Sequence, residues 1–276
     1  MKTPRLAAGI VLLALGLVAG TAQAETTDCT QINSLPAVVS TQGVHCLKGN
    51  LATSSSSGAA IEITVNNVTI DLNGWKVGGQ GAGSATEATG IYSTANNVTI
   101  RNGIVKGFRV GVWLTGRGAK IEDMLLDLNT YTGIWAGGDG ALLRRNQIVS
   151  TGGSTGSSAY DDAFGIYVAG VGSLVDDNLV SGLNGTSDGD EYGIYLGAAA
   201  DNSIVRGNVI ADSAAPPGAG QAVGIRMGNT SRVSVVDNAI NYFDIGIRYF
   251  GVASGVYLYR LETAVSSDVK RKVLLK

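Results

Sequence analysis

The sequence predicts an all-β protein folded as a single-stranded parallel β-helix of about nine coils. Three observations lead to this prediction. Glycine is abundant, with 40 among 276 residues. A Gly-Ile or Gly-Val pair recurs along the chain, and short apolar alternations precede a recurring Asn or Asp. Each repeat is too short to bury an apolar face alone, so neighbouring repeats must stack on one another.

The recurring pair defines the first strand of each coil. Successive pairs lie about 21 to 32 residues apart, which suits a coil of three short strands with loops of variable length. The pairs are Gly90-Ile91, Gly111-Val112, Gly133-Ile134, Gly165-Ile166, Gly193-Ile194, Gly224-Ile225 and Gly246-Ile247.

A second recurring position is polar. It is occupied by Asn102, Asp123, Asn146, Asn178, Asn208 and Asn238, each followed two residues later by an aliphatic residue. Stacked Asn side chains can form a hydrogen-bonded ladder at a turn inside a β-helix. An antiparallel β-sandwich is the alternative fold, whereas leucine-rich repeats and propeller blades need patterns that this chain lacks.

The N-terminus carries an export signal. Lys2 and Arg5 precede an apolar run, and Ala22-Gln23-Ala24 supplies a small-x-small cleavage site, so residues 1–24 are predicted to be a signal peptide. The protein is then secreted or periplasmic, and the mature chain is expected to have no membrane span. Export makes a disulfide between Cys29 and Cys46 the expected state of these cysteines.

The remaining chain divides into three expected parts. Residues 25–60 form an N-terminal cap, 61–255 the β-helix, and 256–276 a C-terminal cap or tail that covers the open end.

Composition excludes several functions. The single histidine, His45, rules out multi-histidine metal centres, and a net charge of −2 makes duplex nucleic acid an unexpected partner.

The segments 66–74 and 96–104 read Asn-Asn-Val-Thr-Ile-Asp-Leu-Asn-Gly and Asn-Asn-Val-Thr-Ile-Arg-Asn-Gly-Ile. With their neighbours, over about residues 45–255, they resemble right-handed parallel β-helix proteins of the pectin-lyase-like superfamily. The resemblance implies a right-handed helix. It leaves function open, because the superfamily includes polysaccharide lyases, glycoside hydrolases, epimerases, tailspikes and adhesins.

An outward column of aromatic residues is the first candidate site. Because side chains alternate along a strand, the residue after each inward Ile or Val faces outward. These residues are Tyr92, Trp113, Trp135, Tyr167, Tyr195, Arg226 and Arg248. Coils about 4.8 Å apart would make the five aromatics a stripe of roughly 20 Å, suited to binding an extended polysaccharide. Mutual stacking for stability alone is the alternative.

Acidic loops beside this stripe are the second candidate site. Asp162 and Asp190 both lie four residues before the anchor Ile, so they should face each other on adjacent coils, with Glu191 close by. Three interpretations remain open: a calcium site formed by Asp162, Asp190 and Glu191, a catalytic carboxylate pair, and a solvated acidic loop.

The family motifs support catalysis only in part. Tyr160-Asp161-Asp162 resembles the paired aspartates of polygalacturonases, but the Gly-His-Gly and Arg-Ile-Lys elements are missing. In pectate lyases an arginine is the base, and Arg226 lies one coil beyond Asp190. The resemblance thus implies Asp162, Asp190 and Arg226 as catalytic candidates for a lyase or hydrolase. A non-catalytic structural or adhesive rod is the alternative function.

Overall fold

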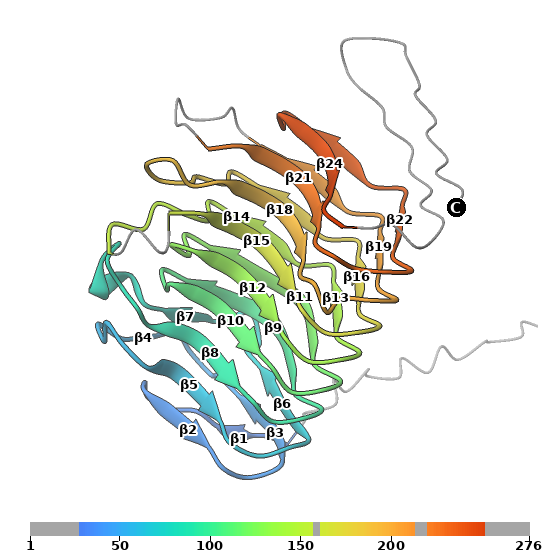
Figure 1. Ribbon diagram of the computed structural model, residues 1–276. Helices are drawn as coiled ribbons and strands as arrows, with labels where there is room; N and C mark the ends of the chain where they lie inside the picture. Colours follow the sequence, from blue (N-terminus) through green and yellow to red (C-terminus); the bar gives the residue numbers. More distant parts are fainter. Residues whose placement is uncertain (1–27, 157–160, 213–219, 252–276) are drawn as a thin grey trace, which may run out of the picture.

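The chain forms two parallel sheets that wind together as a β-helix. The structure, a computed structural model, describes residues 28–156, 161–212 and 220–251. The predicted signal peptide (1–24), the predicted C-terminal cap (256–276) and Tyr160 lie outside these residues. Coils succeed one another from β2 to β24 as stacked rungs (Figure 1). The predicted all-β parallel β-helix is therefore confirmed.

The smaller sheet, sheet B, has nine strands in the described part of the chain, all paired in parallel. Its order is β2 (Ala37–Val39), β5 (Ala59–Ile63), β8 (Thr89–Ser93), β10 (Val110–Leu114), β12 (Thr132–Ala136), β15 (Ala163–Val168), β18 (Glu191–Leu196), β21 (Ala222–Met227) and β24 (Ile245–Tyr249).

The larger sheet, sheet A, has fifteen strands among the described residues and contains the second and third strands of the coils. Its main path is β1 (Thr30–Gln31), β3 (Gly43–Cys46), β6 (Val68–Asp71), β9 (Thr99–Lys106), β11 (Lys120–Asp127), β13 (Leu142–Arg144), β16 (Leu174–Asp176), β19 (Ile204–Arg206) and β22 (Ser234–Val236). The other strands are β4 (Leu51–Ala52), β7 (Lys76–Gly78), β14 (Gln147–Val149), β17 (Leu179–Ser181), β20 (Val209–Ala211) and β23 (Ala239–Asn241). A short 3-10 helix, η1 (Gln80–Ala82), follows β7.

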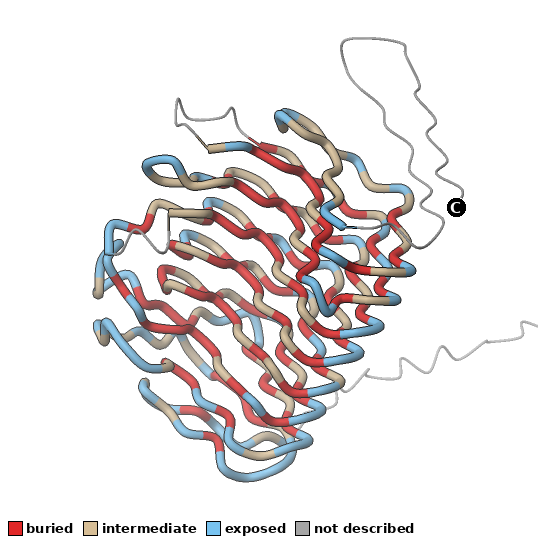
Figure 2. Tube along the Cα trace, viewed as in Figure 1, coloured by how far each residue is buried: buried red, intermediate tan, exposed pale blue. Residues whose placement is uncertain are grey.

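The core is a set of aliphatic stacks that run along the helix axis. The anchor residues Ile134, Ile166 and Ile194 are in direct register and fully buried. Buried positions recur at the same place in successive rungs (Figure 2). Each strand thus buries its inward side chains against the rungs above and below, which no isolated coil could do.

The recurring glycine lies where a side chain would not fit. A Cβ atom on Gly165 would lie 2.4 Å from Cγ1 of Val180 and 2.5 Å from the carbonyl oxygen of Gly193 on the next coil. Both Gly165 and Ile166 therefore face the core, and the outward side chains are those before and after this pair. The repeat needs glycine here because the third strand and the next coil approach too closely for any Cβ.

The asparagine ladder forms over four coils. Nδ2 of Asn146 donates to Oδ1 of Asn178 at 3.0 Å, Asn178 donates to Asn208 at 2.9 Å, and Asn208 donates to Asn238 at 2.8 Å. The same Oδ1 atoms also accept the backbone N–H of the ladder asparagine one coil earlier. The backbone N–H groups of Asn146, Asn178 and Asn208 are therefore satisfied within the core.

The predicted ladder positions in the two earlier coils were wrong by one residue. Asn102 and Asp123 are exposed and have positive φ angles of 58° and 57°. The inward places belong to Gly103 and Met124, which are in register with each other. The backbone N–H of Met124 donates to Oδ1 of Asn146, so the ladder starts there. A left-handed residue precedes the inward residue in every one of these coils, and in the two earlier coils that left-handed residue is the Asn or Asp.

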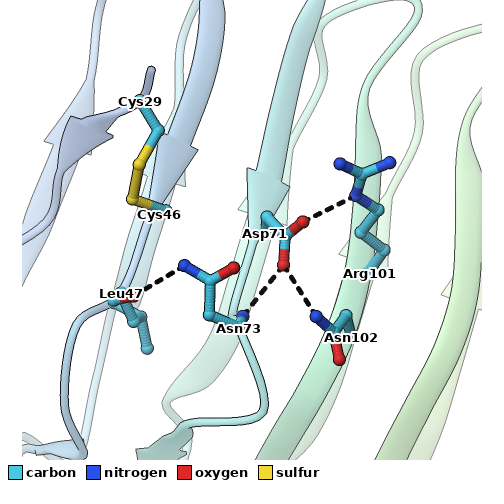
Figure 3. The surroundings of a disulfide bond; sticks show 7 residues. All are labelled: Cys29, Cys46, Leu47, Asp71, Asn73, Arg101 and Asn102. Carbon is cyan, nitrogen blue, oxygen red and sulfur yellow. Dashed lines mark hydrogen bonds and ion pairs between the residues drawn. A yellow bond between two sulfur atoms is a disulfide. The ribbon is translucent and has the colours of Figure 1, made fainter. Parts of the chain in front are cut away.

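The disulfide between Cys29 and Cys46 is present and ties the first described residues to β3 (Figure 3). Strands β1 and β3 pair in parallel beside it. Within the predicted cap, β2 pairs with β5 and β3 pairs with β6, so residues 25–60 contribute strands to both sheets. His45 is buried, and its ring nitrogen Nε2 lies 2.9 Å from the carbonyl oxygen of Thr41, as expected of a structural residue.

Candidate functional site

The predicted aromatic column lies on the outer face of sheet B. Tyr92, Trp113, Trp135, Tyr167, Tyr195, Arg226 and Arg248 occupy one straight column in direct register, with Glu62 one coil before Tyr92. Each of these seven residues is half-buried, and the first six lie between buried residues of the same strands. We call the five aromatics the aromatic column.

The rings of the column are turned toward one another. The rings of Tyr167 and Tyr195 are parallel within 8°, with centroids 5.0 Å apart. The ring centroids of Trp135 and Tyr167 are 4.3 Å apart. The guanidinium carbon of Arg226 lies 4.8 Å from the Tyr195 centroid, on the side opposite Tyr167. The faces of Tyr167 and Tyr195 are therefore covered by neighbours, and these rings offer edges and hydroxyl groups rather than faces to a ligand.

The N-terminal end of the column is less regular. Trp113 and Trp135 are inclined by 34° with centroids 5.3 Å apart, and Tyr92 meets Trp113 edge-on at 5.5 Å. Ring faces there are not stacked in parallel, so this end differs from the closely stacked Tyr167–Tyr195 end.

A second aromatic group lies beside the column and was missed by the sequence analysis. Phe164 and Tyr192 stack with centroids 5.1 Å apart and are 6 % and 2 % exposed, and Val223 continues the group on the next coil. Tyr192 meets Tyr195 edge-on at 5.2 Å. The sequence did contain the signal, because Phe164, Tyr192 and Val223 each directly precede the recurring Gly.

Arg226 joins the aromatic residues to the acidic loops. Its Nη1 donates to the hydroxyl of Tyr192 at 2.7 Å, and the Tyr192 hydroxyl donates to Oδ2 of Asp190 at 2.5 Å. Burial and the hydrogen bond to Asp190 raise the pKa of the Tyr192 phenol, so Tyr192 remains a donor at neutral pH. Arg248, one coil further on, donates from Nη2 to Oε1 of Gln221 at 2.5 Å.

The predicted pairing of Asp162 with Asp190 across adjacent coils is present. Oδ1 of Asp162 accepts the backbone N–H of Asp190 at 2.8 Å, and Oδ1 of Asp190 accepts the backbone N–H of Gln221 at 2.8 Å. Burial, with a smaller contribution from the Asp190 carboxylate, raises the pKa of Asp162. We call Asp162 and Asp190 the acidic pair.

Glu191 does not join the acidic pair. It is 4 % exposed, and its Oε1 accepts the backbone N–H of Gly185 at 2.9 Å. Burial and a hydrogen bond with Asp212 raise the pKa of Glu191 to about 8. Among the residues that the structure describes, no three His, Cys, Asp or Glu side chains are grouped so that they could hold a metal ion. The calcium site of Asp162, Asp190 and Glu191 stays a prediction, although Glu191 contacts Gly185 and Asp212 rather than the acidic pair.

The loops that precede β8, β15 and β18 pack against one another. Ser84 and Thr155 are joined through their side-chain oxygens at 2.8 Å, although they are distant in sequence. The backbone N–H of Thr186 donates to the carbonyl of Asp161 at 2.8 Å, and Gly153 donates to the carbonyl of Asn184. The described parts of these loops are thus hydrogen-bonded to one another from coil to coil, and they form a continuous layer.

A family model described as "Right handed beta helix region" matches residues 89–269. The chain therefore belongs to the right-handed β-helix family, and the stacked parallel strands of the structure agree with this assignment. No curated protein matches the chain. No helix in the described ranges is long and apolar enough to cross a membrane.

Several solved structures share the fold at low similarity. A DFA-IIIase mutant from Arthrobacter chlorophenolicus A6 is 15 % identical, with a TM-score of 0.41, and the alignment covers 71 % of this chain and 61 % of that one. The Dettilon tailspike protein is 13 % identical with a TM-score of 0.34, covering 80 % and 60 %. An alginate lyase from Paenibacillus sp. str. FPU-7 is 13 % identical with a TM-score of 0.29, covering 70 % and 92 %. The chain thus spans less than two thirds of the DFA-IIIase and tailspike chains.

Proposed function

We propose that this protein binds an extended polysaccharide along the outer face of sheet B, across the aromatic column and the two arginines that follow it. The observation that carries this proposal is the arrangement of the aromatic column and the two arginines. All seven residues are half-buried and lie in direct register on successive coils. Rungs repeat about every 4.8 Å, so a polymer lying along the helix axis meets the same type of side chain at regular intervals.

The ring geometry determines how a sugar would be held. The faces of Tyr167 and Tyr195 are covered, so a chain lying there would contact ring edges and accept or donate hydrogen bonds at the tyrosine hydroxyls. Sugar rings would stack on ring faces only toward Tyr92, because the guanidinium carbon of Arg109 lies over the Trp113 ring, 5.8 Å from its centroid. Arg226 and Arg248 favour an acidic polymer at the other end, because guanidinium groups pair well with carboxylates.

Glycan-array binding tests this proposal. The variant Trp113→Ala/Trp135→Ala should lose binding, whereas Trp75→Ala should retain it, because Trp75 is 40 % exposed but lies off the column. Arg248→Gln leaves the five rings in place and should weaken binding of acidic glycans more than that of neutral ones. Wild-type protein that binds no glycan, or a Trp113→Ala/Trp135→Ala variant that is folded and binds normally, would favour the alternative of a structural or adhesive rod.

Catalysis at the acidic pair is a second candidate function, supported by a different observation. Asp162 has a raised pKa beside Asp190, whose two oxygens accept from Gln221 and Tyr192. Two neighbouring carboxyl groups in unlike environments are the arrangement of a general acid and its partner in glycoside hydrolysis. For a lyase, Arg226 would supply the cation that neutralises a uronate or act as the base.

A screen of polysaccharides for new reducing ends and for unsaturated-uronate absorbance tests this second candidate. Asp162→Asn should abolish any activity found while leaving glycan binding in place. Asp162 also accepts the N–H of Asp190, so it has a structural role that Asn can retain. Activity that persists in Asp162→Asn would exclude this residue as the acid.

We also infer that the protein is exported, to the periplasm or the medium. The support is the bond between Cys29 and Cys46, since structural disulfides persist in oxidising compartments. Fractionation of cells that express the full chain, together with the N-terminal sequence of the mature protein, tests both export and cleavage after Ala24.

A further inference from the structure

One register column on the outer face of sheet A consists of six charged residues whose signs alternate. They are Asp71, Arg101, Glu122, Arg144, Asp176 and Arg206, each in direct register with the next. Cys46 precedes the column and Val236 follows it, so the alternation starts with an acid and ends with a base. We call these six residues the ion column.

The ion column is already paired within the chain. Arg101 contacts Asp71 at 2.9 Å, Arg144 contacts Glu122 at 2.7 Å, and Arg206 contacts Asp176 at 2.7 Å. Figure 3 shows the first of these pairs, with the Asp71 carboxylate also accepting from Asn73 and Asn102. The arginine side chains are 39–52 % exposed and the carboxylates 13–17 %. The guanidinium groups therefore remain accessible from outside, whereas the carboxylates are mostly covered.

Aliphatic residues flank the ion column on both sides. Leu142, Leu174 and Ile204 form a register column on one side, and Leu179 and Val209 lie on the other. Ile204 is 40 % exposed and Val209 is 44 % exposed. In the first three coils the column of Leu142 continues as Thr69, Thr99 and Lys120, so the apolar area on that side is confined to the later coils. Exposed apolar residues grouped in this way are typical of an interaction surface.

The ion column is complementary to an antiparallel copy of itself. The ion column starts with an acid at Asp71 and ends with a base at Arg206, so in an antiparallel second copy each acid lies opposite a base. A second copy turned by a two-fold axis between Glu122 and Arg144 would set Asp71 against Arg206, Arg101 against Asp176, and Glu122 against Arg144. We propose that two copies of this chain associate face to face through sheet A, with their helix axes antiparallel. Such an interface is isologous, as most homodimer interfaces are.

The dimensions permit this dimer. Five steps of about 4.8 Å make the ion column about 24 Å long, and strands of the length of β9 span about 26 Å. Each copy would then bury on the order of 600 Å², and the total of about 1,200 Å² lies at the lower end of specific interfaces. Exposed ion pairs add little affinity. In this arrangement Ile104 of each copy would lie against Leu179 of the other and supply apolar contact. Leu142, Leu174 and Ile204 would lie against the polar side chains of Lys120, Thr99 and Thr69. The charges set the register and exclude the parallel arrangement.

Charge swaps within one intrachain pair test the proposal. Asp176→Arg/Arg206→Asp keeps that ion pair within the chain but sets like charges against Asp71 and Arg101 of the second copy. Asp71→Arg/Arg101→Asp has the same effect from the other end. Each variant should dimerise at least about 100-fold more weakly than the wild type, because like charges set against each other across an interface strongly oppose association. An equimolar mixture of the two variants should form a heterodimer, since every contact is again between opposite charges.

The matched control is Glu122→Arg/Arg144→Glu. These two positions face each other across the two-fold axis, so swapping both preserves complementarity and the dimer should persist. Sedimentation equilibrium of the full chain measures all four proteins and the mixture. A wild type that stays monomeric at tens of micromolar, or swap variants that dimerise like the control, overturns the proposal. Glycan binding on sheet B is read separately, so failure of either proposal leaves the other standing.

Discussion

The Nδ2 group of Asn178 donates a 2.9 Å hydrogen bond to Oδ1 of Asn208, the equivalent residue on the next coil. The same Nδ2 also donates to the carbonyl of Leu143 at 2.9 Å. Both residues are buried at 1 % exposure or less. One amide side chain therefore joins three coils in a place where unpaired polar groups would be costly.

Replacing Asn178 with Ala should lower the free energy of unfolding by about 1–3 kcal/mol, because the backbone N–H of Asn146 and the carbonyl of Leu143 lose buried partners. The control is Asn184→Ala in an exposed loop position, which should cost far less. Thermal unfolding measures both. Equal melting temperatures for the two variants would contradict the assignment of Asn178 to a stabilising ladder.

Gly165→Ala should destabilise the helix by about 1–3 kcal/mol or more, as overpacking a rigid core does. The added methyl group would overlap Val180 and the carbonyl oxygen of Gly193, a backbone atom that can move only if the next coil moves. Gly49→Ala is the control, since a Cβ atom on Gly49 would have no other atom within 4 Å. Denaturant unfolding compares the two, and a Gly165→Ala variant as stable as Gly49→Ala would refute the steric role of the repeated glycine.

Stability should fall as the pH rises from about 4.5 to about 8 because of Glu191. In the unfolded chain this carboxyl ionises near pH 4.5, whereas burial and Asp212 hold its pKa at about 8 in the folded protein. The folded state therefore binds more protons in this window, and its advantage declines until the pH exceeds 8. Melting temperatures measured across pH 4 to 9 follow this dependence.

The variant Glu191→Gln should flatten that pH profile, since Gln mimics the protonated acid and can still accept from Gly185. Above pH 8 it should be more stable than the wild type. Glu62→Gln is the control, because Glu62 is exposed on the same outer face of sheet B. A Glu191→Gln profile that parallels the wild type would show that another group causes the dependence.

Removing the disulfide should destabilise the N-terminal coils. Cys29 and Cys46 are separated by 17 positions, and closing a loop of that length contributes about 3 kcal/mol through the entropy of the unfolded chain. Cys29→Ser/Cys46→Ser should melt at a lower temperature than the oxidised wild type, and reductant should lower the melting temperature of the wild type but not that of the variant. Identical melting with and without reductant would mean that the bond adds no stability.

Much of the architecture could be predicted because it repeats. The inward Ile and outward aromatic positions follow from alternation along strands anchored by Gly-Ile, and the structure has them in register. The adjacency of Asp162 and Asp190 followed from the same counting. The error at Asn102 and Asp123 arose because these two polar residues occupy the left-handed place before the inward residue, which the later coils fill with Arg145, Asp177, Gly207 and Asp237.

The ion column was also present in the sequence, at the position after each inward aliphatic of the second strand. It was missed because alternating signs on successive coils lie about 20 to 30 residues apart along the chain, where no local motif joins them. Glu191 was placed with the acidic pair for a related reason. Adjacent residues on a strand point to opposite faces, so closeness in sequence to Asp190 gave no closeness of side chains.

The sequence by itself determined the repeat: the inward Ile positions, the recurring glycine beside them, and which outward residues lie in register from coil to coil. The tertiary structure alone decided how those residues meet. Whether the rings of Tyr167 and Tyr195 turn faces or edges outward, whether Glu191 reaches Asp190 or Asp212, and whether Arg226 joins Tyr192 depend on side-chain torsions and on loops packed between coils. Periodicity fixes the position of a Cβ atom, but the direction of the side chain beyond it is chosen by its neighbours in three dimensions.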